Sequence, residues 1–242
     1  MPPVLELDQL SKSFGAIVVS DALSYSLNEG EALGVIGPNG AGKTSMFNLI
    51  TGALKPDSGE IRFAGKVITN QSAPARCRMG IARSYQIPQP FGGMSVFENV
   101  LVAATQGAGL RGRPADELSI TVLEQTQLMD KANVVAGTLT LIERKRLELA
   151  RALAAKPKIL LLDEIAGGLT EQECQDLVGT ITDIRATGVS IIWIEHIVHA
   201  LLAVVDRLIV IDFGKMIAQG DPKTTMESQQ VQEIYMGIEA DA

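Results

Sequence analysis

A stretch of eight residues contains the residue types that bind phosphate groups in proteins. It runs Gly-Pro-Asn-Gly-Ala-Gly-Lys-Thr and matches the pattern G-x-x-x-x-G-K-[ST] in full. Glycines allow backbone N–H groups to converge on an anion, and a helix beginning at Lys43 adds the positive end of its dipole. In such loops the lysine contacts the β- and γ-phosphates and the threonine hydroxyl ligates Mg²⁺. The alternative is a glycine loop with a purely structural purpose. The expected nucleotide-binding residues here are Gly37, Pro38, Asn39, Gly40, Ala41, Gly42, Lys43, Thr44 and Ser45.

An acidic pair could supply the metal ligand and the water-activating carboxylate that hydrolysis of a bound triphosphate requires. Four apolar residues, 159–162, precede Asp163 and Glu164. Such a run predicts a buried strand, and ligands of open α/β sheets lie at the carboxyl ends of the strands. Asp163 is the expected magnesium ligand, through water, and Glu164 would polarise the attacking water. Acidic strand ends are common by themselves, so this interpretation depends on the phosphate loop.

The apolar patterns around these residues predict alternating strands and helices at both ends of the chain. Near-continuous apolar runs are typical of parallel strands that helices cover on both faces. The middle, roughly 86–155, has helical spacing and little strand signal, so it is predicted as a helical insertion into a parallel-sheet α/β domain. The expected strands are 4–10, 31–36, 60–63, 158–163, 189–195 and 207–212, and the expected helices are 44–51, 96–104, 116–129, 143–155 and 170–186.

The composition excludes several classes of protein. The chain has 242 residues, 46% of them hydrophobic, and a formal net charge of −7. This length and hydrophobic content suffice for a buried core. The acidic balance argues against a nucleic-acid binder that works through a basic surface. Cys77 and Cys174 fit neither a disulfide framework nor a zinc motif. We expect no secretory signal and no membrane span, so any spans would belong to another chain.

With its motifs in this order, the chain resembles the ATP-binding cassette (ABC) ATPases over nearly its whole length. Phe14 occupies the position of an aromatic that stacks on adenine, Gln86 that of a glutamine that reaches magnesium and the attacking water, and His196 that of a histidine that contacts the γ-phosphate. Without this context, Phe14 would be a core aromatic and His196 a structural residue. The resemblance implies ATP and Mg²⁺ as cofactors. It implies the catalytic residues Lys43, Glu164 and His196 and the metal ligands Thr44, Gln86 and Asp163.

The resemblance also implies the fold and its division. The expected class is α/β: a P-loop NTPase with a RecA-like, mainly parallel sheet core, an N-terminal antiparallel β subdomain and an inserted α-helical subdomain. Residues 1–242 would form one ABC ATPase domain. Within it, 1–85 and 156–242 would be the nucleotide-binding core, and 86–155 the helical subdomain with the signature region.

Three segments resemble, more narrowly, the ATPase subunits of branched-chain and hydrophobic amino-acid uptake transporters. They are Ser95–Val100, Arg146–Leu153 and Val231–Gly237. The resemblance implies a peripheral subunit on the cytoplasmic face of the inner membrane. It would energise uptake through transmembrane permease subunits, with a periplasmic or extracellular substrate-binding protein as an indirect partner. A permease helix would rest in a groove beside residues 86–94, unless that segment is a surface loop with a few buried anchors. No nucleic-acid partner is expected.

The sequence departs from the family pattern at the signature, usually Leu-Ser-Gly-Gly-Gln. The matching residues here are Leu139, Thr140, Leu141, Ile142 and Glu143. Branched side chains in place of both glycines should hinder close approach of the backbone to a phosphate. In this family two cassettes pack head to tail, so the altered signature would face the nucleotide of the partner cassette.

The same resemblance bears on the pairing of the chain and on its possible functions. Uptake systems of this subfamily usually have two different ATPases, which favours a heterodimer with a second, related ABC ATPase over a homodimer. The altered signature also motivates a regulatory nucleotide-binding cassette with weak hydrolysis. A soluble, non-transport ABC ATPase is a further alternative. A small-molecule kinase would share the phosphate loop, but it does not explain Gln86, the helical insertion and His196 in that order.

Overall fold

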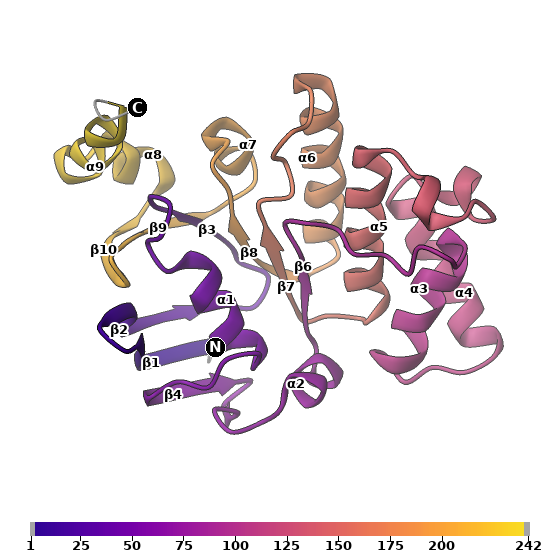
Figure 1. Cartoon of the computed structure of the whole chain (residues 1–242), viewed down its shortest axis with the longest axis horizontal. Coiled ribbons are helices and arrows are strands. Elements are labelled where there is room, and N and C mark those ends of the chain that lie inside the picture. The colour runs from indigo at the N-terminus through magenta and orange to yellow at the C-terminus, as the bar shows by residue number, and fades with distance from the viewer. Residues whose placement is uncertain (1–2, 240–242) are drawn as a thin grey trace.

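The computed structural model describes residues 3–239 and contains two β-sheets with a group of helices at one end (Figure 1). A six-stranded sheet lies centrally. In the view of Figure 1, a four-stranded sheet lies at the lower left and the helical group at the right. The α/β class, the antiparallel β subdomain and the helical insertion expected from the sequence are confirmed.

The central sheet positions the loops that carry the predicted site. Its strands are β3 (Ala32–Ile36), β6 (Ile81–Ser84), β7 (Ile159–Asp163), β8 (Ser190–Ile194), β9 (Arg207–Asp212) and β10 (Lys215–Gly220). They follow the order β10-β9-β3-β8-β7-β6, and all pairs are parallel except β10 with β9. The apolar strands β3, β7 and β8 are buried throughout, as predicted. Because parallel strands end at the same edge, the residues that follow them meet there.

The second sheet is antiparallel and has the order β2-β1-β4-β5. Its strands are β1 (Leu5–Phe14), β2 (Ile17–Leu27), β4 (Ser58–Phe63) and β5 (Lys66–Val67). β1 continues beyond the predicted end at Leu10, and β2 has no counterpart among the predicted strands. Three register shifts interrupt the β1–β2 ladder, and most of the first half of β2 is exposed. Both features hide the regular alternation by which a half-buried strand is recognised.

Three helices form the inserted helical region: α3 (Val96–Gln106), α4 (Arg113–Gln125) and α5 (Leu141–Ala154). Ser95 caps α3. Its hydroxyl accepts a hydrogen bond from the Glu98 N–H at 3.2 Å, and its own N–H donates to the Glu98 carboxylate at 2.7 Å. This reciprocal capping box satisfies two backbone donors that the helix itself leaves unpaired.

The predicted boundaries of the second and third inserted helices need correction. α4 begins before the predicted Asp116, because Pro114 fits the first turn of a helix. It ends before Gln127, whose φ is +57°, so the predicted continuation to Met129 is wrong. Met129 instead begins a short 3₁₀ turn. α5 starts two residues before the predicted Glu143.

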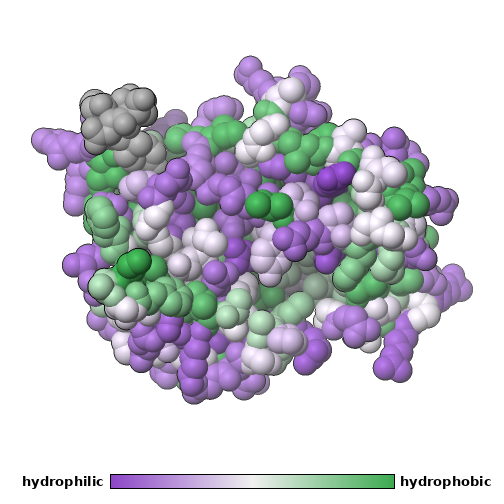
Figure 2. Space-filling model, in the orientation of Figure 1, coloured by the Kyte–Doolittle hydropathy of each residue, from purple (hydrophilic) through white to green (hydrophobic). Residues whose placement is uncertain are grey.

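The remaining helices flank the sheets: α1 (Lys43–Thr51), α2 (Ala73–Met79), α6 (Glu171–Ala186), α7 (Val198–Leu202), α8 (Pro222–Glu227) and α9 (Gln229–Glu239). The buried hydrophobic residues form two clusters, one on each face of the central sheet. One includes Trp193 and the inserted helices, and the other includes Phe47 and the antiparallel sheet. Within residues 3–239, no helix is long and apolar enough to cross a bilayer. The face in Figure 2 is largely polar, with scattered apolar residues.

Candidate functional site

The predicted phosphate loop connects β3 to α1 and is wedged against neighbouring backbone. Gly42 has φ +101°, and a Cβ at this position would lie 2.2 Å from the carbonyl oxygen of Val19 on β2. Only glycine fits this left-handed and crowded position. From the turn between β9 and β10, the Gly214 N–H donates to the Ala41 carbonyl at 2.9 Å. Two other segments therefore fix the shape of the loop.

The start of α1 is open to an anion. α1 has no side-chain cap and no acidic residue in its first turn. Its first N–H groups lack partners within the helix and carry the positive end of the dipole. The loop residues differ in exposure: Asn39, Gly40 and Thr44 are exposed, Pro38 and Ser45 are half-buried, and Gly37 and Ala41 are buried. The Thr44 hydroxyl is thus accessible to a ligand bound at the helix start.

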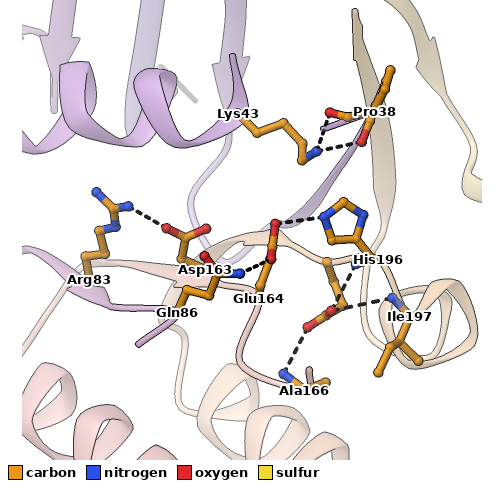
Figure 3. Close-up of polar contacts among 11 residues, drawn as sticks. Pro38, Lys43, Arg83, Gln86, Asp163, Glu164, Ala166, His196 and Ile197 are labelled. Atoms are coloured by element: carbon orange, nitrogen blue, oxygen red, sulfur yellow. Dashed lines mark hydrogen bonds and ion pairs between the residues drawn. The ribbon is translucent and has the colours of Figure 1, made fainter. Parts of the chain in front are cut away.

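Lys43 folds back over the loop (Figure 3). Its ammonium donates hydrogen bonds to the carbonyl oxygens of Gly37 at 2.5 Å and Pro38 at 2.9 Å. Burial lowers the pKa of the Lys43 ammonium, while the carboxylates of Glu164 and Asp163 raise it. The structure therefore brings the phosphate loop and the acidic pair together, although 119 residues separate Lys43 from the start of that pair in the chain.

Asp163 ends β7 as a buried carboxylate with a counter-ion on β6. Its Oδ2 accepts a hydrogen bond from Arg83, and its Oδ1 has no hydrogen-bond partner among the described residues. Burial raises the pKa of the Asp163 carboxyl, while the hydrogen bond and charge of Arg83 lower it. Arg83 also donates to the Asn48 side-chain oxygen at 2.6 Å, and its guanidinium lies 4.8 Å from the ring centre of Tyr85 and 5.4 Å from that of Phe47.

Glu164 lies where three loops meet (Figure 3). Its Oε2 accepts a hydrogen bond from the Gln86 amide, and its Oε1 lies 2.8 Å from Nε2 of His196. Gln86 follows β6, Glu164 follows β7 and His196 follows β8. Because these strands are neighbours in the sheet, the three side chains lie side by side. Glu164 has φ +47°, a backbone conformation that non-glycine residues adopt rarely and often at functional sites.

The residues that match the family signature lie at the start of α5. Thr140 caps the helix: its N–H donates to the Glu143 carboxylate at 2.8 Å, and its hydroxyl accepts from the Glu143 N–H at 3.4 Å. Leu141 and Ile142 are the first two helical residues, so this helix forms without glycine there. Leu141 is 49% exposed and lines a hollow of about 300 Å³ together with Glu164.

Phe14, the expected adenine-stacking residue, lies at the end of β1. Its side chain is half exposed, and the Lys12 ammonium lies 5.4 Å from the centre of its ring. Phe14 pairs with Ile17 across the β1–β2 hairpin. Further along β2, Val19 packs against the backbone of Gly42. The aromatic ring is therefore carried by the hairpin that supports the phosphate loop.

Three buried charged residues beside this site have no role in the sequence-based prediction. They are Arg83, which pairs with Asp163, and Lys145 and Glu195, which are 5% and 1% exposed. An arginine inside a four-residue strand and an acidic residue after an all-apolar strand are signals that could have identified two of them. Lys145 lies on a helix among other charged residues, and nothing in the sequence distinguishes it.

A glycine-rich loop, its lysine and an acidic pair at the carboxyl edge of a parallel sheet define a P-loop nucleoside triphosphatase. The sequence model of the ABC transporter family matches residues 20–167. The chain therefore belongs to the ABC transporter family, as one of its ATP-binding cassettes, and the enzymatic activity of such cassettes is ATP hydrolysis.

Several known proteins are similar to this chain over nearly its whole length. The branched-chain amino acid transport ATP-binding protein BraF of Pseudomonas aeruginosa is 34% identical, with 97% of this chain and 98% of BraF covered. The lipopolysaccharide export ATP-binding protein LptB of Haemophilus influenzae is 32% identical, with 97% of both chains covered. A crystal structure of the ADP conformation of an ABC transporter cassette superposes with a TM-score of 0.88 at 31% identity. The match covers 98% of this chain and 100% of the chain in that structure.

Proposed function

We propose that this chain hydrolyses ATP to energise an ABC importer for branched-chain amino acids or related small polar substrates, which enter through a separate permease. The observation that carries the proposal is the meeting of Lys43, Gln86, Asp163, Glu164 and His196 at one edge of the central sheet. Similarity to BraF along the whole chain supports import of amino acids. The nearly equal similarity to LptB makes export the competing function.

In the proposed mechanism, the loop backbone and the start of α1 bind the phosphates of ATP. The Lys43 ammonium moves from the loop carbonyls to the β- and γ-phosphates and spreads the charge that develops as the γ-phosphate leaves. Phe14 stacks on the adenine ring. These contacts fix the triphosphate relative to Glu164, and such positioning is the main source of rate enhancement in phosphoryl transfer.

The residues at the sheet edge fit a magnesium ion, which prefers oxygen ligands. The unpartnered Asp163 Oδ1 supplies a carboxylate oxygen, the exposed Thr44 a hydroxyl, and Gln86 an amide oxygen. A bound Mg²⁺ would supply positive charge that offsets the charge of the phosphates during hydrolysis. Arg83 keeps the other Asp163 oxygen occupied, so the carboxylate presents one defined oxygen to the metal.

Glu164 acts on the attacking water. Its two carboxylate oxygens are held by Gln86 and His196, which fixes the plane of the carboxylate. In that orientation Glu164 accepts a proton from water as the oxygen attacks phosphorus. His196 contacts the γ-phosphate and loses that contact when phosphate departs. Changes at His196 and Gln86 then pass to the rest of the cassette.

The proposed permease contact lies in a hollow of about 540 Å³ between α2, α3 and α5. Phe91, 45% exposed, and Tyr85, 50% exposed, line it from the segment that contains Gln86. The Arg151 guanidinium lies 5.0 Å from the centre of the Phe91 ring. An apolar helix with a polar flank on the cytoplasmic side of a permease fits this lining. The chain would then lie at the cytoplasmic face of the inner membrane as a peripheral subunit, and a periplasmic or extracellular binding protein would deliver the substrate.

We further propose that the chain pairs with a second, related ABC ATPase and not with itself. The half-exposed Leu141 supports this pairing, because a branched side chain at the start of α5 would impede approach to the phosphates of the partner cassette. In a heterodimer only one of the two nucleotides would face this altered signature. Co-purification with the permease tests the proposal, and a fully active symmetric homodimer would contradict it.

Glu164→Gln tests the hydrolytic role. The variant should bind ATP as the unaltered chain does, because the phosphate loop is untouched, and should lose phosphate release. Binding is measured with a fluorescent ATP analogue and hydrolysis by released phosphate. Near-normal hydrolysis would overturn the role given to Glu164. Weak hydrolysis by the unaltered chain that rises only with a partner cassette would favour the regulatory alternative.

Transport direction is tested in liposomes that contain the chain and its co-purified permease. We expect ATP-dependent accumulation of labelled leucine that requires the binding protein and disappears in the Glu164→Gln complex. A complex that hydrolyses ATP, moves no amino acid and instead extracts lipid from the bilayer would support export in place of import.

A further inference from the structure

Two buried charges next to the site, Lys145 on α5 and Glu195 directly after β8, take no part in the mechanism above. They are 5% and 1% exposed. Burying a charged side chain is unfavourable unless hydrogen bonds and an opposite charge compensate for the lost water. Their partners should therefore show what these two residues do.

Glu195 joins two loops of the site. Its Oε2 accepts a hydrogen bond from the Ala166 N–H at 3.0 Å. Its Oε1 accepts from the His196 N–H at 2.9 Å and from the Ile197 N–H at 3.4 Å. Figure 3 shows these bonds running to Ala166 on one side and to the His196 loop on the other. A single carboxylate thus links the turn that follows Glu164 to the loop that carries His196.

Lys145 holds the same turn from the opposite side. Its ammonium donates to the carbonyl oxygen of Ile165 at 2.9 Å and to that of Gly167. Burial lowers the pKa of the Lys145 ammonium, while the charges of Glu195 and Glu164 raise it. The two residues therefore interact electrostatically through the turn that lies between them.

The turn needs such support because of the residue before it. Glu164 has φ +47°, and a non-glycine residue keeps this unfavourable conformation only where its surroundings impose it. On one side, the Glu164 N–H donates to the Ile194 carbonyl at 2.9 Å. On the other side, Ile165 and Ala166 are buried in the hydrophobic core, and among the described residues Lys145 and Glu195 are the two side chains that hydrogen-bond to the backbone of 165–167.

We propose that Lys145 and Glu195 are positioning residues for ATP hydrolysis, which fix the turn 165–167 so that Glu164 and His196 keep their mutual geometry. The inference rests on the roles proposed for Glu164 and His196. It also gives α5 a direct connection to them: Lys145 lies one helical turn from Leu141, so a displacement of the α5 start by a partner cassette moves the turn next to Glu164.

Glu195→Gln is the primary variant. The amide keeps the shape and can still accept from Ala166, but its NH₂ group cannot accept from the N–H groups of His196 and Ile197. Misplacement of a catalytic group by about 1 Å can reduce a rate roughly 100-fold. We expect kcat to fall about 10- to 100-fold, with the KM for ATP and the number of ATP molecules bound per chain unchanged.

Lys145→Met removes the other contact and keeps the apolar stem of the side chain. It should lower kcat similarly without changing KM. Because both residues act through one turn, the double variant should be little slower than the slower single variant, whereas independent effects would multiply. Glu31→Gln is the matched control. Glu31 is a half-buried carboxylate that pairs with Arg207 at 2.7 Å, away from the Glu164 turn, and its variant should keep normal kcat.

Steady-state phosphate release by the full chain, ATP binding and thermal unfolding are measured for all variants. If Glu195→Gln fails to fold, the kcat and KM of the Lys145→Met variant test the inference instead. A folded variant that keeps kcat within twofold would overturn the inference, as would equal losses of kcat and bound ATP, or multiplicative effects in the double variant. Glu164→Gln in the same series separates the two claims. If it loses hydrolysis while Glu195→Gln does not, only the inference fails, and if it still hydrolyses, the proposed mechanism fails.

Discussion

Arg83 of β6 is the counter-ion of Asp163 at the end of β7, and the side chains of both are only 4% exposed. They are 80 positions apart in the chain, and the parallel pairing of the two strands brings them together. A buried ion pair is weak as a source of stability, because desolvation offsets much of the attraction. Its effect here is on the site: one Asp163 oxygen is occupied, and the other, Oδ1, has no hydrogen-bond partner within residues 3–239.

Removal of Arg83 alone should destabilise the chain strongly. Arg83→Met leaves the Asp163 carboxylate buried without a partner, which typically costs about 3–5 kcal/mol. Urea unfolding without nucleotide measures the change. The double variant Arg83→Met with Asp163→Asn removes both charges and should recover most of the loss. A single variant within 1 kcal/mol of the unaltered chain would show that Asp163 is satisfied by other groups.

Glu148 of α5 predicts a pH dependence of stability. Burial raises the pKa of its carboxyl above the usual 4.5, against the opposing effects of the Arg151 ion pair and of backbone hydrogen bonds. At pH values between the unfolded-state pKa and the folded-state pKa of Glu148, the folded chain binds more protons at this carboxyl than the unfolded chain does. The contribution of Glu148 to stability is therefore highest at low pH and falls as pH rises. Relative to Glu148→Gln, the unaltered chain should therefore lose free energy of unfolding as pH rises from about 4.5 towards neutrality.

Urea unfolding at a series of pH values checks this difference. Glu124→Gln, on the exposed face of α4, is a control that should track the unaltered chain at every pH. The quantity compared is the free energy of unfolding of the unaltered chain minus that of Glu148→Gln. A difference that stays constant, or that increases as pH rises, would contradict the assigned direction of the pKa shift.

Phe14 should contribute to nucleotide affinity by stacking. Loss of one base–aromatic stack costs about 1–3 kcal/mol, so Phe14→Ala should raise the Kd for ATP roughly 5- to 150-fold. Phe14→Trp, which keeps an aromatic ring, should leave the Kd close to that of the unaltered chain. Phe91→Ala removes another half-exposed aromatic from the proposed permease hollow. It should leave the Kd unchanged but reduce ATPase stimulation by the permease. Titration with a fluorescent ATP analogue measures the Kd of both variants, and phosphate release measures the stimulation by the permease. Equal effects of the two substitutions on the Kd would contradict the role given to Phe14.

The features that the sequence predicted are those that depend on local pattern. The run 159–162 is apolar throughout because helices and a second sheet cover both faces of β7. In the loop 37–44, the backbone is crowded at Gly37 and Gly42, which excludes a side chain at both positions. Gln86, Glu164 and His196 could be placed together only through the resemblance to a known family, since no local pattern specifies the order of strands β6, β7 and β8.

What could not be predicted depends on contacts between distant segments. β6 is short and contains Arg83, so its sequence resembles a polar loop until Asp163 is placed beside it. β10 is a half-exposed edge strand that only its pairing with β9 defines. The proposed role of Glu195 and Lys145 becomes visible only when both are seen to hydrogen-bond to the turn 165–167. For the buried charges of Arg83, Glu195 and Lys145, the residue type is unfavourable where it lies, and a partner from another element compensates.

Gly40 and Gly42 separate two reasons for glycine in the phosphate loop. Both have positive φ, +81° and +101°, but a Cβ at Gly40 would meet no atom within 4 Å, whereas one at Gly42 would lie 2.2 Å from the Val19 carbonyl oxygen. Gly40→Ala should cost only the left-handed conformation, about 1–2 kcal/mol. Gly42→Ala must also displace β2, which brings the expected loss to about 2–5 kcal/mol. Urea unfolding without nucleotide compares the two variants. If Gly42→Ala were no less stable than Gly40→Ala, the contact with β2 would not fix the shape of the loop, and the need for glycine at 42 would lie in the approach of the phosphate itself.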